Sequence, residues 1–323
     1  MNKKLLLFLV LPALLSACCG NLEKTRSVVH PDAQGVLRDN AHVHSAAVEI
    51  MQLLGCADIP TQVDKFVELL APKFARKRDQ ERWEMQDNLE ASVKDKVLDK
   101  FDELGFLKTV APRERTYEYI VVFSGTLNSM RRRFAYVKQL WQAGVRAKSV
   151  VFLTGDRLLV PFEDLDSLND RQQTLLPIKK SWQPLEKLPI NETALMQELW
   201  GQADLPADLA ALPCQVVDTP QRTWPDGTVH RPNTGDTLEW WMKSKPVPGR
   251  SLFISNQPYV GYQGAVARHW VPENFLIETV GPEASRDRQK VSVLVDTLFR
   301  WLAFEAFHCK LWDEKTLEAH LKQ

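Results

Sequence analysis

Four short polar clusters in this chain have residue types that bind small ligands. Each comes directly after or before an apolar segment; they are Ser124-Gly125-Thr126, Thr154-Gly155-Asp156-Arg157, Asn233-Thr234-Gly235-Asp236 and Ser255-Asn256-Gln257. Glycine and the first turn of a helix expose N–H groups to an anion, and hydroxyl, amide and carboxylate groups orient it. Any one cluster is weak evidence, because strand-to-helix turns use the same residues. Four such clusters at corresponding places in the alternation of strands and helices predict a shared pocket.

Three arginines follow the first cluster, and Arg133 shares the inward stripe of the helix expected there. We therefore predict an anion or sugar-phosphate site bound by the following residues: Ser124, Gly125, Arg133, Gly155, Asn233, Thr234, Ser255 and Asn256. If the protein is an enzyme, Asp156 or Asp236 is the candidate general base or metal ligand for hydrolysis or transfer. No cofactor is indicated.

Other catalytic motifs are missing from the sequence. It contains no G-x-S-x-G elbow, no G-x-G-x-x-G turn and no Walker loop. Ser124 would act as a nucleophile only if His230 or His269 came close as its base. His42 and His44 lack acidic or cysteine partners in phase, so a surface pair is favoured over a metal site.

The elements that must position the clusters alternate between strands and helices. Almost continuous apolar runs predict strands over 117–123, 149–153, 215–218, 251–254 and 275–280, with helices between them. This alternation predicts an α/β fold, a Rossmann-like, open, mostly parallel sheet flanked by helices. In such sheets ligands bind at the carboxyl ends of the strands, where each polar cluster is expected.

The domain organisation is expected to have four parts. A signal peptide over 1–17 and a tether over 18–40 precede a helical region over 41–112, and residues 113–323 form the α/β domain with an irregular insertion at about 157–212. The run of mixed charges from Lys73 to Glu84 is expected to be a solvated helix face.

The spacing of several residues resembles that of the YdcF/SanA/ElyC family of bacterial envelope proteins. Arg133, Leu140 and Gly144 match an Arg, Leu and Gly of the family pattern, and Thr154-Gly155-Asp156 stands where the family has Ser-Gly-Gly. Asn233 to Asp236 matches a later Asn-Thr with an acidic residue, whereas the family's Thr-Ser and His are replaced by Ser255 to Tyr259. The resemblance covers about 117–282. It implies a Rossmann-like domain with a role in envelope integrity or cell-wall precursor metabolism.

The N-terminus reads as a bacterial lipoprotein signal. Lys3 and Lys4 precede an apolar stretch that ends in Leu15-Ser16-Ala17-Cys18. The stretch is shorter than the ~20 residues needed to span a bilayer. Cys18 is predicted to carry lipid, including palmitate, after cleavage, because two or more acyl chains anchor durably. An ordinary cleaved signal is the alternative. Cys19 in place of Asp favours the outer membrane, facing the periplasm.

Composition excludes some partners. Lys plus Arg number 41 and Asp plus Glu number 41, so no net charge suggests nucleic acid. Besides Cys18 and Cys19, the cysteines Cys56, Cys214 and Cys309 are widely spaced. In an oxidising periplasm one disulfide among them is possible, and buried free thiols are the favoured interpretation.

Two further features leave alternatives open. Trp224, Trp240 and Trp270 would suit glycan stacking, although core packing is the favoured interpretation. The helical region would suit docking of an envelope partner, which would make the protein a non-catalytic scaffold. The preferred expectation is a membrane-anchored lipoprotein that binds an anionic or glycan-type envelope metabolite, with its oligomeric state open.

Overall fold

The computed structural model describes residues 35–77, 80–160, 163–223 and 227–321. Cys18, Cys19 and most of the expected tether lie outside these residues, as does Trp224. Nowhere in the described part is a helix both long and apolar enough to cross a membrane.

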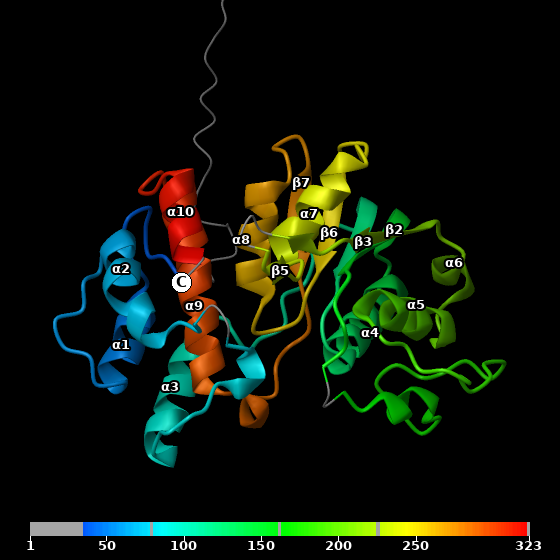
Figure 1. Cartoon of the computed structure of the whole chain (residues 1–323), viewed down its shortest axis with the longest axis horizontal. Helices are drawn as coiled ribbons and strands as arrows, with labels where there is room; N and C mark the ends of the chain where they lie inside the picture. The colour runs from blue at the N-terminus through cyan, green and yellow to red at the C-terminus, as the bar shows by residue number, and fades with distance from the viewer. Residues whose placement is uncertain (1–34, 78–79, 161–162, 224–226, 322–323) are drawn as a thin grey trace, which may run out of the picture.

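A parallel sheet lies at the centre of the molecule (Figure 1). Its five strands are β1 (Thr116–Phe123), β2 (Arg146–Gly155), β3 (Cys214–Thr219), β6 (Arg250–Ile254) and β7 (Leu276–Val280). Their order is β3-β2-β1-β6-β7, and every neighbouring pair is parallel. The predicted Rossmann-like α/β fold is therefore confirmed.

The strand order reverses beside β1. From β1 the chain moves outward through β2 to β3, and it then returns to place β6 on the other side of β1. Short antiparallel strands β4 (Arg222–Thr223) and β5 (Val229–His230) lie on the return connection. The gap between the carboxyl ends of β1 and β6 is consequently the topological switch point, where open α/β sheets bind their ligands.

Two hydrophobic cores cover the two faces of the sheet. One face packs on α4 (Leu127–Gln142), α5 (Glu192–Gln202) and α6 (Ala207–Ala210), with η2 (Leu165–Asn169) beside them. The other face packs on α7 (Thr234–Lys243), α8 (Val260–Trp270) and α9 (Val291–His308). The apolar alternation within β1 explains this, since Val121 and Phe123 belong to one core and Ile120 and Val122 to the other.

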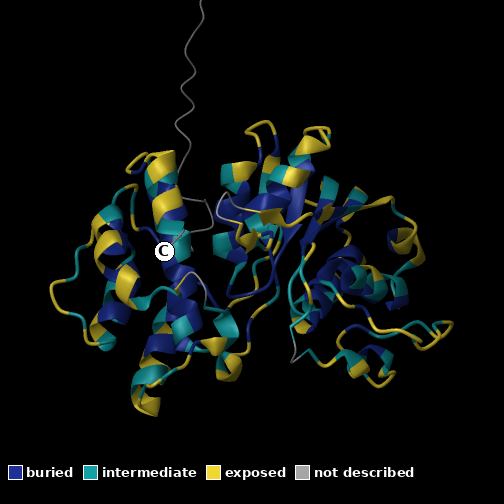
Figure 2. Cartoon of the chain, in the orientation of Figure 1, coloured by how far each residue is buried: buried dark blue, intermediate teal, exposed yellow. Residues whose placement is uncertain are grey.

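The N-terminal helices share the second of these cores. In Figure 1, α1 (Ser45–Leu53), α2 (Val63–Phe74) and α3 (Ala91–Glu103) lie beside α9 and α10 (Glu314–Leu321). Phe66 of α2 packs against Phe299 of α9 in a tilted arrangement, with ring centroids 5.7 Å apart. Figure 2 shows buried residues running from the strands into the inward faces of these helices. The helical region is thus packed into the α/β core.

The expected solvated helix over the mixed-charge run was wrong. Helix α2 ends at Phe74, and the next regular element is a short η1 turn (Arg82–Glu84). A second turn, η3 (Arg286–Arg288), precedes α9. The Lys290 ammonium donates to the carbonyl oxygens of Trp83 and Met85, at 3.0 and 2.9 Å, and so fastens the η1 segment to the start of α9. Arg76, Glu81 and Arg82 of this run form ion pairs with other parts of the fold or with one another. A pattern of charges in the sequence does not by itself distinguish such pairs from a solvated surface.

Gly261 allows α8 and α9 to pack closely. A Cβ atom at this position would lie 2.1 Å from a ring carbon of Trp301. In an open helix, Gly→Ala stabilises by about 1 kcal/mol. Here we expect Gly261→Ala to destabilise the protein by about 1–3 kcal/mol, because overpacking outweighs helix propensity.

Gly201 in α5 is the matched control. Its added Cβ would meet Trp182 at 3.7 Å, which is ordinary contact. Gly201→Ala should therefore leave stability unchanged or raise it by up to about 1 kcal/mol. Urea unfolding of both variants checks the pair, and a stabilised Gly261→Ala would show that the α8–α9 contact is loose.

The three described cysteines, Cys56, Cys214 and Cys309, are free thiols. The prediction of free thiols is confirmed, but the prediction that they are buried is wrong, since Cys56 and Cys309 are partly exposed and Cys214 is exposed. Burial raises the pKa of the Cys214 thiol to about 11, so it is protonated at neutral pH.

Candidate functional site

The predicted clusters lie along the carboxyl edge of the sheet. Ser124 and Gly125 follow β1, whereas Ser255 and Asn256 follow β6, its neighbour in the sheet. Gly155 ends β2 on the other side of β1. The parallel register therefore brings three of the four clusters to adjacent strand ends.

Arg133 joins the first and fourth clusters. Its Nη1 donates to the carbonyl oxygens of Phe123 and Ser124 at 2.8 and 2.5 Å, and its Nε donates to Asn256 Oδ1 at 2.9 Å. The side chain is 3% exposed, and burial lowers the pKa of its guanidinium to about 10, so it keeps its charge at neutral pH. The acceptors that the described residues offer it are all neutral, so a buried cation stands at the switch point with no carboxylate of that part of the chain in contact.

Glu192 is the site residue that the sequence did not reveal. Its Oε2 accepts from the Ser124 hydroxyl at 2.8 Å, and its Oε1 pairs with Arg157 Nη1 at 3.2 Å. It is 6% exposed, and burial raises the pKa of the carboxyl although Arg157, Ser124 and Arg133 oppose this. Glu192 connects the first cluster to the second, since Arg157 directly follows Asp156.

The remaining residues of the second cluster have different surroundings. A Cβ on Gly155 would lie 2.4 Å from Pro232, so the strand end packs against the segment that precedes α7. The Asp156 side chain is exposed, and its backbone N–H donates to Thr219 at 2.8 Å. The structure thus places this candidate base on the surface of the edge, outside the contacts around Arg133.

The third cluster forms a helix cap. Asn233 Oδ1 accepts from the N–H groups of Gly235 and Asp236, and Asp236 Oδ2 accepts from the Asn233 N–H at 2.8 Å. Asp236 Oδ1 also pairs with Arg222 at 3.2 Å. Thr234 is the first residue of α7. The oxygens of Asn233 and Asp236 therefore satisfy the first turn of α7, which leaves them less free to bind a ligand.

Two expected donors are already engaged by the protein itself. The first amide of α4, that of Leu127, donates to Glu163 Oε2 at 3.0 Å, so a carboxylate from the insertion occupies the helix start where an anion was expected. The Ser255 hydroxyl donates to Gln263 Oε1 at 2.5 Å and is fully buried. Ser255 therefore supports the loop after β6.

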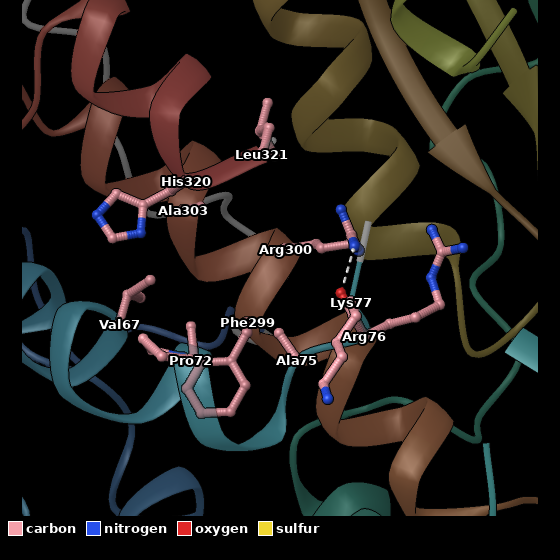
Figure 3. A pocket seen from close by; sticks show the side chains of 11 residues that line it. Val67, Pro72, Ala75, Arg76, Lys77, Phe299, Arg300, Ala303, His320 and Leu321 are labelled. Carbon is pink, nitrogen blue, oxygen red and sulfur yellow. Dashed lines mark hydrogen bonds between the residues drawn. The ribbon is translucent and has the colours of Figure 1, made fainter. Parts of the chain in front are cut away.

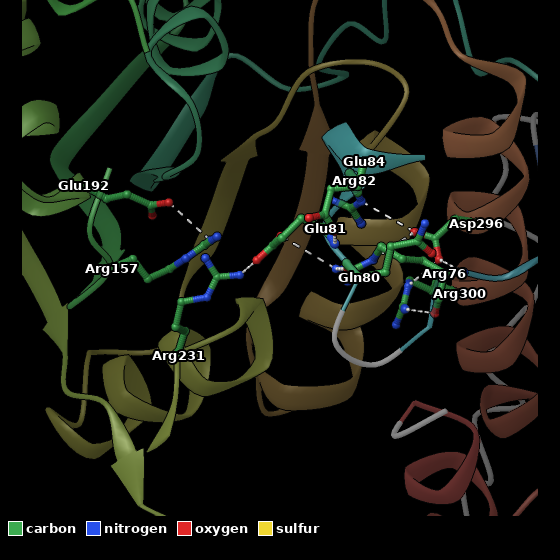
Figure 4. Close-up of polar contacts among 10 residues, drawn as sticks. All are labelled: Arg76, Gln80, Glu81, Arg82, Glu84, Arg157, Glu192, Arg231, Asp296 and Arg300. Atoms are coloured by element: carbon green, nitrogen blue, oxygen red, sulfur yellow. Dashed lines mark hydrogen bonds and ion pairs between the residues drawn. The ribbon is translucent and has the colours of Figure 1, made fainter. Parts of the chain in front are cut away.

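The N-terminal region adds arginines to this edge (Figure 4). The Arg82 guanidinium lies 4.7 Å from the ring centroid of Tyr259, which caps the start of α8 in the connection after β6. Asp296 of α9 pairs with Arg300 at 2.9 Å, with Arg82 at 3.5 Å and with Arg76 at 3.9 Å. One carboxylate thus balances three guanidinium groups.

A second set of ion pairs connects these groups to the return connection. Glu81 pairs with Arg231, which lies just before α7, and its other oxygen is 3.8 Å from Arg76 Nη1 (Figure 4). The contacts described so far involve seven guanidinium groups and five carboxylates, which are Arg76, Arg82, Arg133, Arg157, Arg222, Arg231 and Arg300 with Glu81, Glu163, Glu192, Asp236 and Asp296. Guanidinium groups therefore gather between the strand ends and α9, and such groups match phosphate and carboxylate geometry.

A cavity of about 180 Å³ lies between α2, α9 and α10 (Figure 3). Val67, Pro72, Phe299 and Ala303 form mostly apolar walls, and Arg76 and Arg300 lie at one side. None of the predicted site residues lines it. Among the described residues, no group of three or more His, Cys, Asp or Glu side chains is arranged to hold a metal ion.

Buried carboxylates make stability depend on pH. Burial raises the pKa of Glu305, but Arg268, His308 and Trp301 lower it more, to about 2. A depressed folded pKa contributes stability above the unfolded value near 4, and that stability is lost as pH falls toward 2. We expect the free energy of unfolding to fall in this window by on the order of 3 kcal/mol from this group.

Urea unfolding between pH 5 and pH 2 measures this loss. Glu305→Gln should flatten the dependence, because it removes the titrating group, whereas Glu186→Gln at an exposed position should follow the wild-type curve. Equal slopes for all three proteins would contradict the assignment to Glu305.

Comparison of the chain with protein-family models, with curated proteins and with solved structures found no match.

Proposed function

We propose that the protein binds a small phosphate-type anion, such as a sugar phosphate of the bacterial envelope, at the carboxyl edge of β1, β2 and β6. The observation that carries this proposal is the buried guanidinium of Arg133, which among the described residues donates to neutral oxygens and stands beside the Arg157–Glu192 pair. Holding a charge there is costly unless a ligand benefits from it. Ser124 and Gly125 are half-exposed and offer a hydroxyl and a close approach to the backbone.

A thermal-shift series tests this proposal. Inorganic phosphate, glucose 1-phosphate and a nucleoside diphosphate are compared with uncharged glucose at equal ionic strength. A ligand at 100 times its Kd stabilises the folded state by about 2.7 kcal/mol, so the phosphates should raise the melting temperature saturably. No shift with any phosphate, or an equal shift with Arg157→Gln, would overturn it. Lys187→Gln, an exposed change in the insertion, should behave as wild type.

We further propose that the protein works as a lipoprotein anchored through Cys18, facing the periplasm, and as a distant member of the YdcF/SanA/ElyC family. The lipobox supports the anchor, and the spacing of Arg133, Leu140 and Gly144 supports the family. Radiolabelled palmitate should be incorporated into the wild-type chain in cells. Cys18→Ser should abolish the label, and a labelled Cys18→Ser chain would exclude this anchor. Cys56→Ser is the control.

The alternative role as a scaffold has a narrower basis. The inward faces of α1, α2 and α3 are buried in the core that they share with α9, so only their outer faces remain to dock a partner. Ligand binding at the sheet edge is therefore the preferred proposal.

A further inference from the structure

Ser124 and Glu192 form a pair with the geometry of a nucleophile and its base. The Ser124 hydroxyl donates to Glu192 Oε2 at 2.8 Å, within the range required for direct proton transfer. Ser124 is partly exposed at the carboxyl end of β1, the edge where open α/β sheets bind their ligands. From the sequence, only a histidine was considered as a base for Ser124. In the structure, the carboxylate of Glu192 lies in that position.

Glu192 is held firmly in this position. It is the first residue of α5, and Asn191 caps that helix by accepting from the Ala194 N–H at 2.9 Å. The Glu192 N–H donates to the Arg157 carbonyl oxygen at 2.9 Å, which fastens the helix start to the end of β2. Arg157 also holds the second carboxylate oxygen, so Oε2 remains directed at Ser124.

The surroundings suit a reaction at phosphorus. Arg133 contacts the carbonyl oxygen of Ser124 itself, so its positive charge lies beside the serine. Charge that develops on phosphate oxygens during transfer is stabilised by such preorganised groups. Burial raises the pKa of Glu192 above its ordinary value, and a carboxylate with a higher pKa is a more effective base.

We propose that Ser124 is the nucleophile and Glu192 the general base of a phosphate-monoester hydrolase or phosphotransferase. The Ser124 oxygen attacks phosphorus, the bond from phosphorus to the ester oxygen breaks, and Glu192 passes the serine proton to the departing alcohol. Water then attacks the phosphoserine, Glu192 takes its proton, and the bond from phosphorus to Ser124 breaks as the serine regains a proton. The products are the alcohol and inorganic phosphate. This inference rests on the anion site proposed above.

An alkyl fluorophosphonate tests the pair without knowledge of the natural substrate. Serine attack forms an oxygen–phosphorus bond and expels fluoride, and the mass of the intact protein reports the adduct. We expect one equivalent on Ser124, located by peptide mapping, and none on Ser124→Ala. Glu192→Gln should slow labelling by about 100-fold, which is the usual contribution of a general base. The wild-type rate should rise with pH and reach a plateau as Glu192 ionises.

Matched controls separate the pair from a general loss of structure. Ser244→Ala lies at the opposite end of the sheet, where Ser244 contacts Gln215 at the start of β3, and Glu198→Gln lies on α5 itself. Both should label as wild type. If Glu192→Gln fails to fold, Glu192→Asp, which withdraws the carboxylate by one methylene, must slow labelling as well. Labelling that is spread over many serines, or is unchanged in the Glu192 variants, overturns the proposal.

Calorimetric titration with inorganic phosphate distinguishes the two proposals. Phosphate binding without labelling of Ser124 overturns the serine step and leaves the anion site standing. Labelling without phosphate binding overturns the anion site and leaves an activated serine.

Discussion

Asp296→Ala is expected to destabilise the protein by about 3–5 kcal/mol, because removing one partner of a buried ion pair leaves charges without compensation. Asp296 is fully buried, and its Oδ1 accepts from the Arg76 N–H at 3.0 Å and from Arg300 at 2.9 Å. Burial raises the pKa of this carboxyl, but Arg300, Arg82 and the Arg76 N–H lower it more, so it is charged at neutral pH.

Asp296→Ala should also loosen the segment that carries Arg76 and Arg82, because both pair with Asp296. Arg76 and Arg82 would lose their shared carboxylate, so trypsin should cut after Arg76 or Lys77 much faster than in the wild type. Urea unfolding and limited proteolysis measure the two effects. Asp287→Ala at an exposed position is the control. A loss below about 1 kcal/mol would place Asp296 among weakly coupled surface pairs.

Arg133→Met should weaken phosphate binding by about 10-fold or more, because it removes a positive charge beside the site, although its Nε and Nη1 already donate within the protein. It should also destabilise the fold by about 1–3 kcal/mol, because the carbonyl oxygens of Phe123 and Ser124 lose their donor. Calorimetric titration with phosphate and urea unfolding separate these effects.

Two further variants sharpen the interpretation of Arg133. Arg133→Lys keeps the charge but loses the forked geometry, so binding should be intermediate. Arg132→Met removes the neighbouring, half-buried arginine, which contacts the Glu283 carbonyl oxygen, and should bind phosphate as the wild type does. Equal loss in Arg132→Met and Arg133→Met would mean that only the overall charge of the helix matters.

The sheet was predictable because its strands are buried on both faces. The near-continuous apolarity of β1 and β2 marks them as central strands, and the glycines after them mark where they end. Arg133 was predictable as well, because it shares the inward stripe of α4 with Phe134 and Val137, and all three are buried.

The contacts of Glu192 and Asp296 could not be predicted in the same way. Glu192 reaches Ser124 across 68 residues, from an insertion with no periodic pattern before its helix, and Asp296 reaches Arg76 across 220 residues. No local spacing encodes such pairs. Their only sequence signal is a charged residue on a helix that is otherwise apolar, as Asp296 is within α9.

The third cluster shows how one motif serves two explanations. Asn233 and Asp236 are three residues apart before an apolar helix, which is the spacing of a capping box as well as of a ligand loop. In the structure, the side chains of Asn233 and Asp236 accept from backbone N–H groups at the start of α7, which confirms the capping box. Where a helix begins at such a motif, helix capping explains its residues better than ligand binding does.

Arginine side-chain NMR on the ¹⁵N-labelled protein tests the anion site most directly. The Nε–Hε resonances of Arg133 and Arg157, assigned with single Arg→Lys variants, are followed as inorganic phosphate is added at constant ionic strength. We expect both resonances to shift saturably with one common Kd, and the resonance of Arg146, at the opposite end of β2, to stay unchanged. Unchanged Arg133 and Arg157 resonances up to saturating phosphate would contradict it.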